Sequence, residues 1–157
     1  DYALNKKVLD LGTGSGVLAL EATKYTKEVL ATDINEEAVL QVQRLGITAL
    51  HSDLFSNINE KFDLILFNPP YLPKEEQEDA ETARITTGGK TGSEILERFL
   101  KDSVSYLNAE GTILLVVSSL TGDVEVLFKK YHFTSKKIDE EKLFFEQLFV
   151  YELAQKP

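Results

Sequence analysis

The fold is decided by a stretch near the start of the chain, residues 7–22, which reads KVLDLGTGSGVLALEA. Its first part, from Lys7 to Leu11, is short and apolar, as in a buried strand. Residues 17–22 have the composition of a helix. Between them lie three alternate glycines, Gly12, Gly14 and Gly16. A strand, a glycine loop and a helix in this order predict a turn whose backbone can approach a ligand closely.

The charge of this turn limits its ligands. Asp10 ends the predicted strand, and an acid there would repel a pyrophosphate but attract an ammonium or a sulfonium group. Val17 stands where a dinucleotide-binding fingerprint would have its last glycine. The alternative interpretation is a tight strand–helix turn that binds nothing.

Two further predicted strands end on acids. Residues 28–33 close on Asp33, which lies 17 positions after Gly16. An acid near this spacing binds ribose hydroxyls in related folds, although Asp33 could instead be a cap or turn acid. Residues 48–53 close on Asp53, which could accept a hydrogen bond from the exocyclic amine of a base or cap the next turn. The two interpretations of Asp53 remain equally open.

The segment between these strands predicts a helix. Asn35 has the character of its N-cap, and Gly46 ends it. His51 has no second histidine, cysteine or acid at ligand spacing, so it is interpreted as a strand residue. We expect no metal site in this chain.

The fourth apolar run, residues 62–67, leads directly into Asn68, Pro69, Pro70 and Tyr71. Two prolines cannot continue a strand, and a residue before proline is held extended. The result is a stiff turn at the carboxyl end of a core strand, where open α/β sheets bind ligands. It offers an amide oxygen, a backbone carbonyl and an aromatic ring, which suit a substrate with an NH2 group. The alternative is an ordinary turn.

The remaining pattern completes an α/β fold. A polar loop is predicted over 72–91; we expect it to close over the substrate, with Arg84 and Lys90 as candidate contacts. The elements expected after it are a helix from Ser93 with apolar positions as far as Val104 and Leu107, a strand at 112–117, a helix from Asp123, and two strands within 133–153 with a bend near Leu143 and Phe144. This order predicts a doubly wound, mostly parallel seven-stranded sheet with an antiparallel C-terminal hairpin.

Composition narrows the class. The 157 residues suit one domain over 1–157, and because they begin at Asp1 we expect that a short native N-terminal segment is missing. No apolar run approaches the roughly 20 residues of a membrane span, and cysteine is absent. We therefore expect a cytoplasmic protein. The net charge of −9 argues against a nucleic-acid substrate, although it does not exclude a local basic patch.

These motifs, in this order and over essentially the whole chain, resemble the class I S-adenosylmethionine-dependent methyltransferases, which have a Rossmann-like fold. The resemblance implies S-adenosylmethionine as cofactor and S-adenosylhomocysteine as product. The cofactor-binding residues it implies are Asp10, Gly12, Gly14, Gly16, Asp33, Ile34, Asp53, Leu54 and Asn68.

Within that class the chain most resembles the compact archaeal and eukaryotic branch of the glutamine N5-methyltransferases, which modify the Gly-Gly-Gln loop of translation release factors. The Asn-Pro-Pro-Tyr motif carries this resemblance, and residues 88–99 add to it. It implies that Asn68, Pro69 and Tyr71 are catalytic and that these three and Pro70 bind the substrate amide. The implied partners are a release factor, as the protein substrate, and a small activating subunit. The family's upstream segment, which helps to enclose the cofactor, is not in this sequence.

Two alternatives remain at this point. An adenine N6-methyltransferase acting on DNA or RNA would use the same motif, but it would need a stacking slot and a basic approach path. A non-catalytic partner subunit that only binds S-adenosylmethionine could lose the Asn-Pro-Pro-Tyr motif without penalty, yet this chain keeps it.

Overall fold

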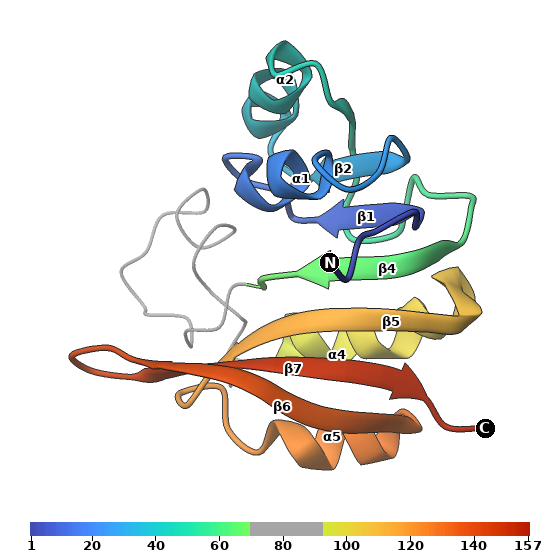
Figure 1. Cartoon of the computed structure of the whole chain (residues 1–157). Coiled ribbons are helices and arrows are strands. Elements are labelled where there is room, and N and C mark those ends of the chain that lie inside the picture. The colour runs from blue at the N-terminus through green and yellow to red at the C-terminus, as the bar shows by residue number, and fades with distance from the viewer. Residues whose placement is uncertain (70–92) are drawn as a thin grey trace. The chain divides into compact units, whose positions relative to one another are not determined.

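The computed structural model describes residues 1–69 and 93–157 (Figure 1). Its strands form one seven-stranded sheet in the order β3-β2-β1-β4-β5-β7-β6. Strands β1 to β4 pair in parallel and β6 pairs antiparallel with β7, which confirms the predicted fold class. The chain divides into two compact units, Asp1–Phe67 with Ser103–Leu114, and Asn68–Asp102 with Leu115–Pro157. The single domain over 1–157 stays a prediction.

The first unit holds the strands that follow one another from the N-terminus. Its elements are β1 (Val8–Leu11), α1 (Val17–Ala22), β2 (Val29–Asp33), α2 (Glu36–Arg44), β3 (Thr48–His51), β4 (Phe62–Phe67), the 3₁₀ turn η1 (Val104–Tyr106) and the first part of β5 (Leu107–Ser118). The second unit holds α4 (Glu94–Ser103) up to Asp102, the end of β5, α5 (Val124–Lys130), β6 (Phe133–Lys142) and β7 (Gln147–Gln155).

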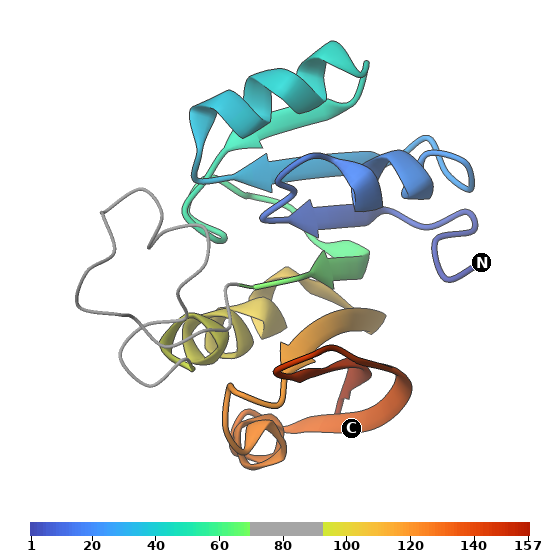
Figure 2. The ribbon, with the colours of Figure 1, turned by 90° about the vertical axis from the view of Figure 1, so that its left-hand side faces the viewer.

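The core of the first unit lies between the parallel strands and two helices. Ala19 and Ala22 of α1 and Val39 and Val42 of α2 pack with alternate residues of β1, β2 and β4. Figure 2 shows both helices along these strands. Leu9, Leu11, Ile65 and Phe67, which point to the other face by alternation, are buried as well. Burial on both faces explains why these strands are continuous apolar runs.

The second unit is built on the β6–β7 hairpin. Phe128 of α5 is fully buried, and its ring meets that of Tyr151 on β7 edge-on, with 5.2 Å between centroids. Asp123 caps α5 by accepting from the Val126 N–H at 3.4 Å, which confirms the predicted helix start. The hairpin turn after Lys142 confirms the predicted bend.

Three predicted boundaries are wrong. Strand β3 ends at His51 instead of Asp53, because the Ser52 hydroxyl binds the backbone at Leu54 and Asn57 and turns the chain. Helix α4 ends at Ser103, so Val104 and Leu107 lie outside it.

Strand β5 correspondingly begins at Leu107, five residues before the predicted start. Val104 and Leu107 continue the helical spacing of the apolar residues in α4, so the sequence pattern placed this boundary too late. At Gly111 a Cβ atom would lie 2.6 Å from Leu107 Cδ1, so a glycine at this position leaves room for the buried Leu107 side chain. The Asn108 amide donates to Asp63 of β4 at 2.7 Å and anchors the start of the strand.

Candidate cofactor and substrate site

The predicted cofactor residues other than Asn68 lie along one edge of the first unit. Strands β1, β2 and β3 are parallel neighbours, with Leu11 paired to Thr32 and Asp33 paired to His51. Their carboxyl ends therefore lie together, and the glycine loop, Asp33 and the turn after β3 all follow from that edge. Parallel register brings together residues that are distant in sequence.

The glycine loop depends on left-handed backbone. Gly12, Gly14 and Gly16 have φ values of 69°, 55° and 84°. At Gly16 an added Cβ would lie 2.9 Å from the Val42 side chain, so this glycine lets α1 approach α2. At Gly14 the same test meets no described atom within 4 Å, so the loop is open on that side and can admit a ligand.

Asp10 holds this loop in place from inside the fold. It was predicted to end the strand but lies within β1, one residue before the strand ends at Leu11, and it is only 1% exposed. Its Oδ2 accepts from the Thr13 hydroxyl at 2.7 Å and from the Ala19 N–H at 3.0 Å. Burial raises the pKa of Asp10 to about 6, although both hydrogen bonds oppose that rise. Thr13 was missed in the sequence, where its position three residues after Asp10 inside the loop was the available signal.

Asp33 bridges two loops at the end of β2. Its Oδ2 accepts from the Gly14 N–H and its Oδ1 from the Asn35 N–H, both at 2.9 Å. Asp33 is therefore a turn acid, as the alternative interpretation held. A carboxylate has about four acceptor positions, so the capacity to bind ribose hydroxyls remains.

Ile34 and His51 connect the ends of β2 and β3. The His51 Nε2 lies 2.8 Å from the Ile34 carbonyl oxygen. Because a carbonyl can only accept, Nε2 must carry the proton in this contact. His51 is thus the strand residue that was predicted, but it also positions the segment after Asp33, a role that the sequence did not reveal.

The turn after β3 presents Asp53 and Leu54. Asp53 is exposed, and its N–H donates to the Ser56 hydroxyl at 3.1 Å. Leu54 has φ of 49°, an unfavourable backbone for leucine, and the Ser52 hydroxyl donates to its carbonyl at 2.7 Å. Such strain is common at binding sites. Their role in cofactor binding stays a prediction.

The substrate motif begins where β4 ends. Phe67, the last residue of β4, pairs with Leu11 of β1, and its ring lies 3.6 Å from the Cβ position of Gly12. Asn68 and Pro69 follow at once; Asn68 is exposed and Pro69 is buried. Pro70 and Tyr71 lie outside the described residues, as do the predicted loop over 72–91 and its candidate contacts Arg84 and Lys90.

The charges at this edge suit a cationic ligand with hydroxyl groups. Asp10 and Asp33 are both acidic, and no lysine or arginine occurs in residues 8–20 or 29–35. Two carboxylates without a nearby lysine or arginine in the sequence fit the sulfonium, ammonium and ribose groups of S-adenosylmethionine better than a pyrophosphate. Over residues 1–69 and 93–157, no three histidine, cysteine, aspartate or glutamate side chains are grouped to hold a metal ion. In the same residues, no helix has the length and apolar character needed to span a membrane.

Comparison with known proteins identifies the class. Residues 1–145 match the methyltransferase small domain, so the chain belongs to this family of class I methyltransferases, whose cofactor is S-adenosylmethionine.

Two relatives carry more specific names than the family does. A protein of Methanocaldococcus jannaschii, named as a proposed protein N5-glutamine methyltransferase, is 41% identical over 134 residues, which are 80% of this chain and 68% of that protein. The release factor glutamine methyltransferase of Streptococcus pneumoniae is 34% identical over 85% of this chain. This chain spans 53% of that bacterial enzyme.

A solved structure agrees in fold. A chain of the E. cuniculi Mtq2–Trm112 complex, described as responsible for methylation of the translation termination factor eRF1, is 26% identical with a TM-score of 0.80. The match covers 98% of this chain and 87% of that one.

Proposed function

We propose that this protein transfers a methyl group from S-adenosylmethionine to the side-chain amide nitrogen of a glutamine in the Gly-Gly-Gln motif of a translation release factor. The observation that carries the proposal is the position of Asn68 and Pro69, immediately after a strand that is paired to the glycine-loop strand. The M. jannaschii, S. pneumoniae and E. cuniculi relatives support the same substrate class.

The cofactor half of the proposed site lies in the first unit. Asp33 would accept from the ribose hydroxyls, and Asp10, whose Oδ1 is not used in its bonds to Thr13 and Ala19, would attract the amino-acid end. Gly12 and Gly14 would let the backbone approach it. Bound S-adenosylmethionine supplies an electrophilic methyl group on sulfur.

The substrate half must activate a poor nucleophile. The lone pair of an amide nitrogen is delocalised, so the nitrogen attacks well only when it is aimed and its developing positive charge is stabilised. Asn68 Oδ1 and the Pro69 carbonyl would each accept one N–H of the glutamine amide and do both. With the amide held in this way, the nitrogen would take the methyl group from the sulfur of the bound cofactor, leave that sulfur as a neutral thioether and lose one proton to solvent. Pro70 and Tyr71 would complete the amide-binding surface.

Asn68→Ala tests this assignment. It removes one of two acceptors for the amide but leaves the glycine loop and Asp33 untouched. The single-turnover rate should fall about 10²–10³-fold, the scale for loss of one preorganised polar contact. The resemblance also places Asn68 in the cofactor site, but we assign its side chain to the substrate amide, so cofactor affinity and melting temperature should stay close to wild type. A folded, cofactor-binding variant with the wild-type rate would remove Asn68 from catalysis.

The substrate itself is tested by transfer of labelled methyl groups. Purified release factors, other proteins and nucleic acids are offered, with and without a small Trm112-type subunit, because the E. cuniculi relative occurs in such a complex. We expect label on the glutamine nitrogen of the Gly-Gly-Gln motif. Methylated adenine would replace this proposal with the nucleic-acid alternative. Cofactor binding without transfer to any substrate would favour a non-catalytic subunit.

A further inference from the structure

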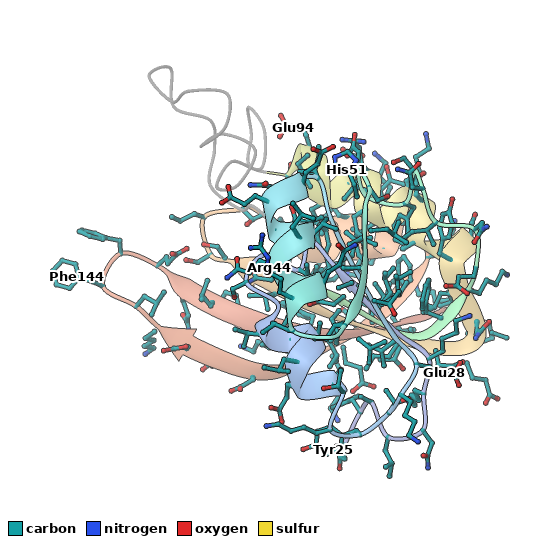
Figure 3. All side chains as sticks on the ribbon, turned by 90° about the horizontal axis from the view of Figure 1, so that it is seen from above. Tyr25, Glu28, Arg44, His51, Glu94 and Phe144 are labelled. Atoms are coloured by element: carbon teal, nitrogen blue, oxygen red, sulfur yellow. The ribbon has the colours of Figure 1, made fainter. Side chains whose placement is uncertain are left out.

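The turn between β6 and β7 presents two phenylalanines to solvent. Phe144 is 92% exposed and Phe145 is 86% exposed. Their rings lie edge to face, with 4.7 Å between centroids. Figure 3 shows Phe144 at the outer end of the hairpin. Single exposed apolar residues are ordinary, but two adjacent aromatic rings without cover at the tip of a hairpin indicate a contact surface.

This aromatic tip, residues 143–146, is held in a defined place. The Leu143 N–H donates to the Glu146 carbonyl at 2.8 Å and closes the turn. The Ser118 hydroxyl donates to the Glu146 carboxylate. Ser119 exchanges two bonds with the Gln147 backbone, at 2.8 and 3.0 Å. These bonds tie the tip to the carboxyl end of β5, so it is not a frayed hairpin.

The location of the tip relates it to the substrate motif. Strand β5 is the neighbour of β4 in the sheet, and Asn68 and Pro69 follow β4. Asn68, Pro69 and the aromatic tip all belong to the second unit. The tip is therefore a candidate docking element for a protein that presents its glutamine to Asn68.

The edge of the hairpin is protected against pairing with another strand. Strand β6 is the last strand of the sheet, and its register shifts between Lys137 and Asp139. Its side chains are mostly exposed and charged. An edge with a bulge and charges resists strand addition, whereas the aromatic tip carries no such protection. Contact through the tip is therefore favoured over contact through the edge.

The charge around the tip indicates the partner. Asp139, Glu140 and Glu141 precede the tip in the chain, Glu146 belongs to it, and Lys142 is the one lysine among residues 138–147. Glu140 pairs with Lys137 at 2.8 Å, so the negative charge around the tip comes from Asp139, Glu141 and Glu146. The whole chain is also negative, at −9. A partner surface complementary to this tip would be basic and would contain an apolar pocket for the two rings.

We propose that the aromatic tip docks the protein substrate of the methyl transfer by placing Phe144 and Phe145 in an apolar pocket of a basic protein surface. This inference rests on the proposed function and extends it, since it names where the substrate protein is held outside the glutamine itself. Exposed aromatic pairs of this kind are typical anchors of protein interfaces.

The test compares an intact release factor with a short Gly-Gly-Gln peptide. The double variant Phe144→Ser/Phe145→Ser should raise KM for the intact protein about tenfold or more, the scale of an aromatic anchor. The values of kcat, cofactor Kd and KM for the peptide should not change, because a short peptide lacks the basic surface and apolar pocket that the tip would bind. Leu40→Ser, which alters a 51% exposed leucine on α2, is the matched control and should have no effect. Glu141→Lys should raise KM for the intact protein at low salt only.

Several outcomes would overturn the docking role. An unchanged KM for the intact protein would do so, as would an equal rise with Leu40→Ser. A parallel loss on the peptide would indicate local distortion instead. A variant that alters only self-association, or only binding of a small subunit, would assign the tip to that partner. Wild-type protein that methylates no release factor would contradict the proposed function, whereas wild-type transfer with unaffected variants would contradict only the docking role.

Discussion

At the scale of single residues, Asp33 combines a structural role with a proposed binding role. It accepts from Gly14 and Asn35, so its loss affects the loop as well as any bound ribose. We expect Asp33→Ala to weaken S-adenosylmethionine binding by about 1.5–3 kcal/mol or more, the scale of hydrogen bonds to a charged group. Isothermal titration calorimetry measures this directly.

Asn35→Ala is the matched control for that experiment. It removes the bond from Glu37 N–H to Asn35 Oδ1 and should lower the free energy of unfolding by about 1 kcal/mol. It should leave the cofactor Kd unchanged, because the Asn35 N–H that binds the Asp33 carboxylate belongs to the backbone and is kept in the variant. Equal Kd values for wild type and Asp33→Ala would exclude Asp33 from the site.

Asp10 should make stability depend on pH in an unusual direction. Its pKa is raised from 3.8 to about 6 in the fold, so the folded state holds the proton more tightly than the unfolded state. Its contribution therefore favours folding below pH 3.8 and is lost as pH rises through 6. Asp10→Asn retains an oxygen for Thr13 and Ala19 and carries no buried charge.

Denaturant titrations across pH give the measurement. The difference in unfolding free energy between Asp10→Asn and wild type should grow from near zero at pH 3.5 to as much as about 3 kcal/mol above pH 6.5, in favour of the variant. Cofactor affinity should fall in the same variant, since the charge that attracts the ammonium group is gone. A difference that does not change with pH would show that Asp10 titrates normally.

At the scale of elements, the α1–α2 contact depends on Gly16. Gly16 and Gly46 both have φ above 80°, but only Gly16 faces a side chain, Val42. Gly46→Ala should cost about 1–2 kcal/mol of stability from backbone strain alone. Gly16→Ala should cost about 1–3 kcal/mol more, because the new methyl group overpacks the helix contact. Urea unfolding of the two variants separates strain from packing; equal losses would contradict the close contact.

At the scale of the whole molecule, the net charge of −9 should determine how activity responds to salt. A protein substrate should give only a modest rise in KM between 50 and 200 mM salt. A nucleic-acid substrate would lose roughly 10³–10⁵ in affinity over that range through counterion release. The slope of log KM against log salt is the measurement. A steep slope together with methylated adenine would reverse the choice of substrate.

The sequence by itself determined the order and type of most elements and the main chemistry. Burial on both faces sets the hydrophobic runs, glycine permits left-handed backbone and proline restricts it, so residues 7–22 and the Asn68–Pro69 turn could be interpreted without a structure. Asn35 was predicted as a helix cap and Asp123 as a helix start for the same local reason. The boundaries of β3, α4 and β5 could not be predicted from the sequence, because Ser52 and Gly111 act through contacts that helical or strand periodicity does not encode.

Only the tertiary structure decided how the acids are used. Asp10 and Asp33 look equivalent in sequence, since each occurs at the end of an apolar strand. The register of the sheet buries one under α1, where burial raises its pKa, and leaves the other half-exposed against the loop. It also left Phe144 and Phe145, which the sequence placed in a bend, uncovered in solvent. Burial and long-range pairing depend on the whole chain, and no local pattern contains them.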